Sequence, residues 1–275
     1  MEKIRRNERM SAMMKILADS PNRIFTLSYF CDLFGAAKST MSEDIDILRD
    51  VVRQFNLGEL ETVTGAAGGV RYRCSVSQPD ALRFIQALCG ELSGTSRVLP
   101  GRFLYYSDIL SNPKMVQGMG AILATAFADQ APDFVLTMET KGIPVAMSTA
   151  TALGVPLIIA RHASKVYEGP AVNINYVSGS GRIETMSLTR RAVQEGQRAL
   201  IVDDFLRAGG TAKGMADLMH EFGATVVGMA FVMATREPEK KRVAGEKSLM
   251  ILSISGDDEE TATVTPAPWL LEQRP

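Results

Sequence analysis

The sequence is short of the residues that most metal sites and disulfide frameworks require. It holds only two histidines, His162 and His220, which nearly excludes a histidine-based metal centre or a catalytic triad. Its three cysteines, Cys31, Cys74 and Cys89, are scattered and odd in number, so no disulfide framework or paired metal ligand is expected. We expect buried, reduced thiols in a cytoplasmic protein.

Long hydrophobic runs and a strong net charge are also missing. No apolar stretch reaches the about eighteen residues of a membrane helix, and the N-terminus lacks the apolar core of a secretory signal, so no membrane partner is expected. The net charge of −1 argues against a chain that coats nucleic acid non-specifically, so any DNA contact must come from a local patch. The length of 275 residues, 46% of them hydrophobic and 22% charged, is typical of a globular protein with about two domains.

The N-terminal part of the chain has the pattern of a small helical domain. Apolar residues at spacings of three and four predict helices over residues 7–17, 27–34 and 37–55. Gly35 is a suitable stop for the second helix, and the tight turn that follows leads into the longer third one. A short helix, a glycine-containing turn and a longer helix are typical of a helix-turn-helix.

A hairpin is expected directly after these helices. Residues 60–63 and 70–74 have the pattern of two short strands, and the tip between them is rich in glycine, which tolerates positive φ. The helices and the hairpin together predict a winged-helix domain over residues 1–74. A helix and a linking stretch are expected over residues 75–112.

Residues 113–255 alternate apolar runs with helical patterns. The runs at 134–138, 155–160, 199–202 and 225–234 are expected to be strands, and glycine ends the helices between them. This alternation predicts an α/β fold with a central parallel sheet, covered on both faces. Ligands of such sheets bind outside the carboxyl ends of the strands. The tail that follows is acidic and weakly patterned.

One segment, residues 200–211, has the pattern of a ligand-binding site. An apolar strand delivers Asp203 and Asp204 to its C-terminal end, and Gly209 and Gly210 open a helix. Free N–H groups at a helix start can cradle a phosphate, and Thr211 can cap the helix or offer its hydroxyl. Two carboxylates beside a phosphate would repel it unless they bind ribose hydroxyls or Mg²⁺. Ordinary turn chemistry explains either half of this string but not the whole, which therefore indicates a sugar phosphate.

The segment resembles the phosphoribosyl pyrophosphate (PRPP) signature of type I phosphoribosyltransferases, whose fold would cover about residues 113–255. The resemblance implies that Asp203 and Asp204 contact the ribose hydroxyls. The residues of the 5′-phosphate loop would be Arg207, Ala208, Gly209, Gly210 and Thr211. Ala208 departs from the pattern, because many members have threonine there, but the backbone donors survive that change.

Two further loops match the same family. The segment with Thr140, Lys141 and Gly142 resembles the pyrophosphate loop, in which the lysine and backbone N–H groups would meet the diphosphate. Residues 161–181 resemble the mobile loop that closes over PRPP, with Lys165 as its most suggestive basic residue.

A wider resemblance covers nearly the whole chain. The segments 63–70, 99–101, 140–144, 173–180 and 203–205 are similar to the purine operon repressors of Gram-positive bacteria. The resemblance implies a homodimer in which a winged helix is fused to a non-catalytic phosphoribosyltransferase-like effector domain, residues 75–275. It also implies repression of purine biosynthesis and related genes, with PRPP as the inducer that releases operator DNA. Mg²⁺ could accompany PRPP, and guanosine tetraphosphate could compete for the same pocket.

The charge balance of the N-terminal domain does not by itself identify the DNA-binding residues. Residues 1–74 hold eleven Lys and Arg against ten Asp and Glu, and the third helix carries Glu43, Asp44, Asp46 and Asp50, which we expect to face solvent or the other domain. The basic residues nevertheless cluster at the N-terminus, at the start of the third helix and beside the wing, where a winged helix needs them. The candidate DNA-binding residues are Arg5, Arg6, Lys38, Ser39, Thr40, Ser42, Arg71 and Arg73. A winged helix that serves only for dimerisation is the alternative.

An alternative interpretation is that the chain is an active purine phosphoribosyltransferase with an appended regulatory domain. A repressor and an enzyme would both bind PRPP, so the PRPP signature does not distinguish the two functions. Catalysis would also need a pocket for the base and a positioned acid or base. No base-recognition segment is identifiable, and only Trp269 in the tail offers a stacking platform, although a packing role is commoner for such a residue. No catalytic residue and no protein metal site are predicted.

Overall fold

The computed structural model describes residues 4–65, 68–163, 169–178, 181–256 and 260–272. The chain divides into two compact units, which are described separately below. Residues 1–77 with 151–154 form the first unit, and residues 78–150 with 155–275 form the second. Among the described residues, no helix is long and apolar enough to cross a membrane.

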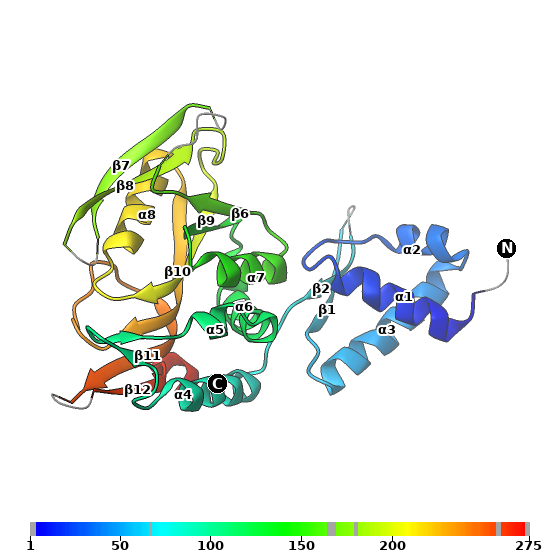
Figure 1. The fold of residues 1–275 in the computed structure, drawn as a ribbon. Helices are drawn as coiled ribbons and strands as arrows, with labels where there is room; N and C mark the ends of the chain where they lie inside the picture. The colour runs from blue at the N-terminus through cyan, green and yellow to red at the C-terminus, as the bar shows by residue number, and fades with distance from the viewer. Residues whose placement is uncertain (1–3, 66–67, 164–168, 179–180, 257–259, 273–275) are drawn as a thin grey trace. The chain divides into compact units, whose positions relative to one another are not determined.

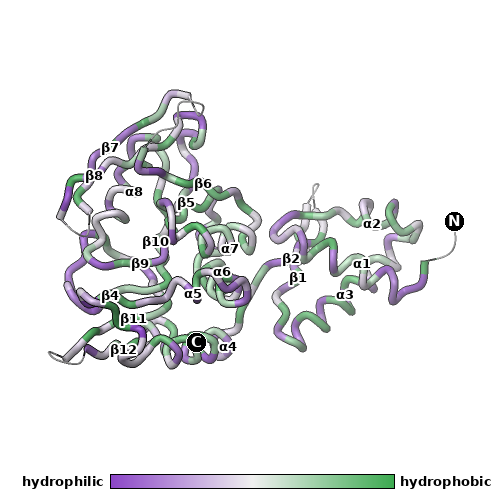
Figure 2. Tube along the Cα trace, viewed as in Figure 1, coloured by the Kyte–Doolittle hydropathy of each residue, from purple (hydrophilic) through white to green (hydrophobic). Residues whose placement is uncertain are grey.

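The first unit is a three-helix domain with a hairpin, as the sequence predicts. Its elements are α1 (Arg6–Ala18), α2 (Leu27–Phe34), α3 (Lys38–Gln54), β1 (Glu59–Val63) and β2 (Gly69–Arg73). Figure 2 shows hydrophobic and hydrophilic residues alternating along these helices, and their apolar sides enclose a core around Met13, Phe30 and Met41.

The predicted ends of α2 are correct. The hydroxyl of Thr26 accepts a hydrogen bond from the Tyr29 N–H at 3.2 Å, which caps the start of the helix. Gly35 ends it in the left-handed conformation at φ 61°, where a glycine has no Cβ clash. The chain therefore turns sharply into α3, and the two helices form the helix-turn-helix.

The second unit is built on a six-stranded sheet. Across the sheet the strands are β12 (Thr261–Pro266), β11 (Lys247–Ser255), β10 (Thr225–Thr235), β9 (Arg198–Leu206), β5 (Phe134–Met138) and β6 (Leu157–Ala160). All neighbouring strands are parallel except the edge strand β12, which is antiparallel to β11. The predicted α/β fold with a central parallel sheet is therefore confirmed.

Helices cover both faces of this sheet. The main ones are α4 (Gln78–Leu92), α6 (Pro113–Phe127), α7 (Ile143–Leu153) and α8 (Gly210–Glu221). Helix α8 packs on one face, and α4 and α6 lie on the other (Figure 1). The shorter elements are β3 (Val98–Leu99), β4 (Phe103–Leu104), α5 (Ser107–Leu110), the 3-10 turn η1 (Ala128–Gln130) and α9 (Pro268–Leu271).

One sequence expectation is wrong in this unit. Residues 161–181 are not one long loop, because β7 (Ala171–Val177) pairs along its whole length with β8 (Ile183–Thr189) in a hairpin that packs against α8. The weakly patterned C-terminal tail supplies β12 and α9. Trp269 belongs to the packing there, and its indole N–H donates to the carbonyl oxygen of Ser248 at 2.6 Å.

Candidate functional sites

The two loops singled out from the sequence meet at one edge of the sheet. They follow β5 and β9, which are parallel neighbours, so both loops leave from the same side. Helix α7 leads from β5 to β6 in one direction across the sheet, and α8 leads from β9 to β10 in the other. This reversal is the topological switch point at which open α/β sheets bind their ligands.

Gly142 and Asp203 are in close contact at this point. A Cβ atom added to Gly142 would lie 2.0 Å from Asp203 Oδ1 and 2.5 Å from Thr137 Oγ1. Only glycine lets the loop after β5 approach the carboxylate so closely. Thr137, which the sequence analysis did not single out, is buried, and its hydroxyl has no hydrogen-bond partner among the described residues.

The paired carboxylates occupy different environments. Strand β9 continues to Leu206, so Asp203 and Asp204 lie within the strand, close to its predicted C-terminal end. The side chains of neighbouring strand residues point to opposite faces. Asp203 is only 7% exposed, and its burial, together with the charge of Asp204, raises its pKa well above the usual value. Asp204 Oδ2 instead accepts a hydrogen bond from the hydroxyl of Tyr106 at 2.6 Å.

The glycine-rich loop opens α8 as a cradle of backbone N–H groups. Gly209 occupies the N-cap position at φ 82°, and Gly210 is so close to β7 that an added Cβ would lie 2.0 Å from the carbonyl oxygen of Val177. The N–H of Lys213 bonds to the carbonyl oxygen of Gly209 at 2.9 Å, so the N–H groups of residues 210–212 have no acceptor within the helix. Thr211 is not the N-cap as the sequence suggested, and it lies inside the first turn.

The remaining predicted residues of this site border a cavity or support its loops. The carbonyl oxygen of Ala208 accepts the backbone N–H of Arg242 at 2.9 Å, and that of Thr140 accepts the N–H of Ile143 at 3.3 Å. Lys165 lies outside the described residues. A cavity of about 830 Å³ adjoins the site. Its walls include Phe103, Tyr106, Lys141, Phe205, Arg207 and Arg236.

The first unit holds a separate groove between the start of α3 and the hairpin. It has a volume of about 530 Å³, and Lys38 and Ser42 line it together with residues of the wing. Both side chains are exposed, as is Ser39 in the same first turn, while Thr40 is half-buried. Lys38 and Ser42 thus line a groove beside the N-terminal part of α3.

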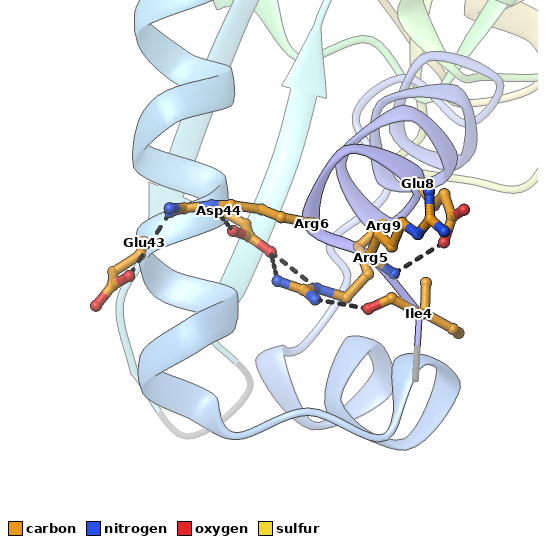
Figure 3. Close-up of polar contacts among 7 residues, drawn as sticks. All are labelled: Ile4, Arg5, Arg6, Glu8, Arg9, Glu43 and Asp44. Carbon is orange, nitrogen blue, oxygen red and sulfur yellow. Dashed lines mark hydrogen bonds and ion pairs between the residues drawn. The ribbon is translucent and has the colours of Figure 1, made fainter. Parts of the chain in front are cut away.

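Arg6 and Arg9 belong to an ion-pair cluster with Asp44 (Figure 3). The expectation that Asp44 faces solvent or the other domain is wrong, because the residue is fully buried. Its carboxylate accepts hydrogen bonds from Arg6 Nε at 2.8 Å and from Arg9 Nε and Nη2 at 3.0 and 2.8 Å. A buried carboxylate requires such partners, which the sequence spacing could not reveal. Arg6 remains half-exposed, with Glu43 3.6 Å away.

The two arginines of the wing share one acidic partner. Arg71 Nε lies 2.7 Å from Glu61 Oε2, and Arg73 Nη1 lies 3.2 Å from Oε1, across the β1–β2 pair. Burial alone would raise the pKa of Glu61, but the hydrogen bonds and charges of the two arginines hold it below its usual value. Both candidate DNA contacts are therefore neutralised in part by a neighbour. The backbone N–H of Arg5 donates to Glu8 at 2.8 Å.

Comparisons with known proteins agree with the division into two units. Residues 5–74 match the family model for the N-terminal part of the bacterial purine repressor, and residues 105–266 match that for the phosphoribosyl transferase domain. The adenine phosphoribosyltransferase structure from Thermoanaerobacter pseudethanolicus is similar with a TM-score of 0.52 and 24% identity, covering 61% of this chain and 98% of that one. This likeness shows the fold of the second unit.

Two curated relatives cover nearly the full length. The purine biosynthesis transcriptional repressor of Bacillus subtilis is 41% identical, over 91% of this chain and 88% of its own length. A protein of Lactococcus lactis, named a purine biosynthesis transcriptional activator, is 36% identical, over 90% of this chain and 92% of its own. The two names give opposite signs of regulation to relatives with the same span.

Proposed function

Because this chain belongs to the bacterial purine repressor family, we propose that it represses purine biosynthesis and related genes and is released from operator DNA by PRPP. The observation that carries the proposal is the contact of Gly142 with Asp203 at the switch point of the second unit. It joins a predicted diphosphate loop to a predicted ribose site, on a chain whose first unit is of the repressor type.

PRPP would bind the second unit, where different residues would contact its 5′-phosphate, its ribose and its diphosphate. The N–H groups at the start of α8 and the exposed Arg207 would bind the 5′-phosphate, because a helix N-terminus favours anions. The two aspartates would accept the ribose hydroxyls. The loop with Thr140, Lys141 and Gly142 would bind the diphosphate.

Mg²⁺ fits this arrangement as a companion of PRPP. Among the described residues, no group of three or more acidic, histidine or cysteine side chains could hold a metal by itself. Mg²⁺ is commonly bound by one or two carboxylates together with the phosphates of a ligand, and Asp203 and Asp204 supply such carboxylates. The cation would offset the negative charge between the aspartates and the diphosphate. Guanosine tetraphosphate, which also carries diphosphates, would compete for the same loops.

Operator DNA would bind the first unit at the groove beside α3. Lys38 and Ser42 face this groove, and the N-terminal residues of a recognition helix are those that reach base edges. Arg71 and Arg73 would meet phosphates beside the wing, in competition with Glu61 for their charges. A homodimer would present two such surfaces to an operator with two half-sites.

Induction follows from linkage between the two sites. PRPP releases DNA only if it binds more tightly to the conformation that has low DNA affinity, and such couplings are typically about 1–3 kcal/mol. The measurement that tests the proposal is operator binding, titrated with PRPP at one fixed salt concentration, because the affinity depends steeply on salt. Release of DNA by PRPP supports it. Tighter DNA binding in the presence of PRPP would refute the assigned sign and favour an activator.

An active phosphoribosyltransferase is the second candidate, favoured by the match of residues 105–266 to the transferase domain. We propose that the pocket senses PRPP without catalysis, since the full-length relatives are named transcriptional regulators. Incubation with PRPP and each purine base separates the two readings. Formation of nucleotide would contradict the sensor role, and its absence, with DNA release intact, would support it.

A further inference from the structure

The hydroxyl of Tyr106 donates a hydrogen bond to one of the two carboxylates at the candidate ribose site. It lies 2.6 Å from Asp204 Oδ2, although the two residues are 98 positions apart in the sequence. Tyr106 is only 7% exposed, and its ring stacks on that of Phe205, with centroids 6.0 Å apart. Burial and the nearby carboxylates raise its pKa above the usual value, so the phenol keeps its proton and remains a donor.

This hydrogen bond has the chemistry of the bond that a ribose would make. A sugar hydroxyl and a phenol are both O–H donors to a carboxylate, and such charge-assisted bonds are short and strong. A carboxylate oxygen can accept more than one hydrogen bond. In this site, however, Tyr106 is nearly buried and its ring packs against Phe205, so the phenol fills the space on its side of Asp204 Oδ2. A ribose hydroxyl that approaches Oδ2 from that side must therefore take the position of the phenol.

The position of Tyr106 is also tied to the candidate diphosphate loop. The ammonium group of Lys141 lies 5.3 Å from the centroid of the Tyr106 ring, within the range of a cation–π contact. Tyr106 further lines the cavity, two residues after the end of β4 and at the N-cap of α5. One side chain thus contacts a residue assigned to the ribose and a residue assigned to the diphosphate.

We propose that Tyr106 is a specificity-determining residue that competes with ribose hydroxyls for Asp204 and weakens every ligand that uses this carboxylate. The inference rests on the proposed binding of PRPP in the second unit. Before such a ligand binds, the phenol satisfies Asp204 in its partly buried position. Ligand binding breaks the Tyr106–Asp204 bond, so the net gain from the ribose is only the difference between the two bonds.

The variant Tyr106→Phe tests this competition, because it keeps the ring against Phe205 and Lys141 and removes only the hydroxyl. We expect PRPP and ribose 5-phosphate to bind the variant about fivefold more tightly, which corresponds to one net hydrogen bond of about 1 kcal/mol. Inorganic pyrophosphate has no ribose, so its affinity should stay within about twofold. Titration calorimetry of the full chain with the three ligands measures these ratios.

The controls separate the inference from the proposed function. Tyr29→Phe removes an exposed phenol of α2 in the first unit and should leave all three affinities unchanged. If the wild type itself fails to bind PRPP, the proposed function and this inference both fall. If the wild type binds PRPP but Tyr106→Phe binds it equally or more weakly, only the competition is refuted. A parallel change for pyrophosphate would show a general structural effect and would also overturn it.

Discussion

Arg9 donates two hydrogen bonds to the buried carboxylate of Asp44, from Nε at 3.0 Å and from Nη2 at 2.8 Å. The pair joins α1 to the second turn of α3, whose first turn carries Lys38. The remaining guanidinium nitrogen of Arg9 donates to the carbonyl oxygen of Ile4 at 3.1 Å (Figure 3). The pair therefore fixes the start of the helix that we assign to DNA recognition.

Replacement of Asp44 by alanine should destabilise the first unit strongly. The substitution leaves Arg9, whose side chain is 10% exposed, without its carboxylate, and an uncompensated buried charge costs about 3–5 kcal/mol. Differential scanning calorimetry of the full chain would show the loss. The matched control is Asp19→Ala, which removes the exposed Lys15–Asp19 pair and should cost less than about 1 kcal/mol. Equal effects of the two substitutions would contradict the structural role of Asp44.

Replacement of Glu61 by glutamine should strengthen DNA binding. The change removes the negative charge beside Arg71, so its guanidinium meets less competition for a phosphate. Each additional phosphate contact steepens the dependence of log K on log salt by about 0.9, which is the increase that we expect here. Fluorescence anisotropy with labelled operator at several salt concentrations measures both the affinity and the slope.

Glu59→Gln is the control for this experiment. Glu59 lies on the same strand, is exposed and takes part in no ion pair among the residues that the structure describes. Its substitution changes the net charge by the same amount and leaves the Arg71–Glu61 pair in place. Identical gains for the two variants would mean that net charge, and not the Glu61 contacts, controls affinity.

Because Asp203 is buried, we expect Asp203→Asn to raise the melting temperature by an amount that depends on pH. The folded-state pKa of Asp203 is raised above its unfolded value, so its stabilising contribution is complete below the unfolded pKa and is lost as the pH rises through the folded one. Asparagine carries no charge to bury. We expect the melting temperature to exceed that of the wild type by about 3 °C at pH 8, a gain that shrinks towards about pH 4.

Two further measurements define the meaning of this result. The control is Asp32→Asn, which removes a carboxylate from an exposed position of α2. Asp203→Asn should also bind operator DNA normally but respond poorly to PRPP. A gain in stability that is constant from pH 4 to pH 8 would show that the charge of Asp203 is not its source.

An alanine at Gly142 should abolish the response to PRPP. Its Cβ would lie 2.0 Å from Asp203 Oδ1, so either the loop or the carboxylate must move away from its present position. We expect PRPP to bind at least about tenfold more weakly, because misplaced contacts lose most of their free energy. Gly90→Ala in α4 meets no atom within 4 Å and should leave binding unchanged while slightly stabilising the helix. Normal PRPP binding by Gly142→Ala would refute the assigned site.

Local chemistry made much of the fold predictable. The apolar runs predicted the bounds of strands β5 and β10 to within one residue. Gly35 and Gly154, which were expected to end helices, both have the positive φ values of helix stops. The meeting of the two site loops was also predictable, because neighbouring parallel strands end at the same edge of the sheet. These features depend on residues that are close together in the chain.

The features that escaped prediction depend on contacts between distant residues. The helical period of α3 places Asp44 on the same side as the buried Met41 and Leu48, but it does not reveal its partners Arg6 and Arg9, some 35 positions away. Tyr106 was missed for the same reason. The β7–β8 hairpin was missed because glycines and serines on either side of β7 made the whole stretch resemble a loop, although β7 itself contains neither residue.

The packing of α4 against β12 has a consequence for synthesis on the ribosome. The backbones of Gly94 and Ala262 exchange two hydrogen bonds, at 2.9 and 3.1 Å, so the first and last parts of the second unit meet at one place. Translation proceeds at about 5–20 residues per second. For about 10–30 seconds the nascent chain therefore exposes the apolar side of α4, while residues 1–77 of the first unit have already been synthesised. During that interval α4 needs protection from other chains, and chaperones that bind exposed apolar helices have their best opportunity there.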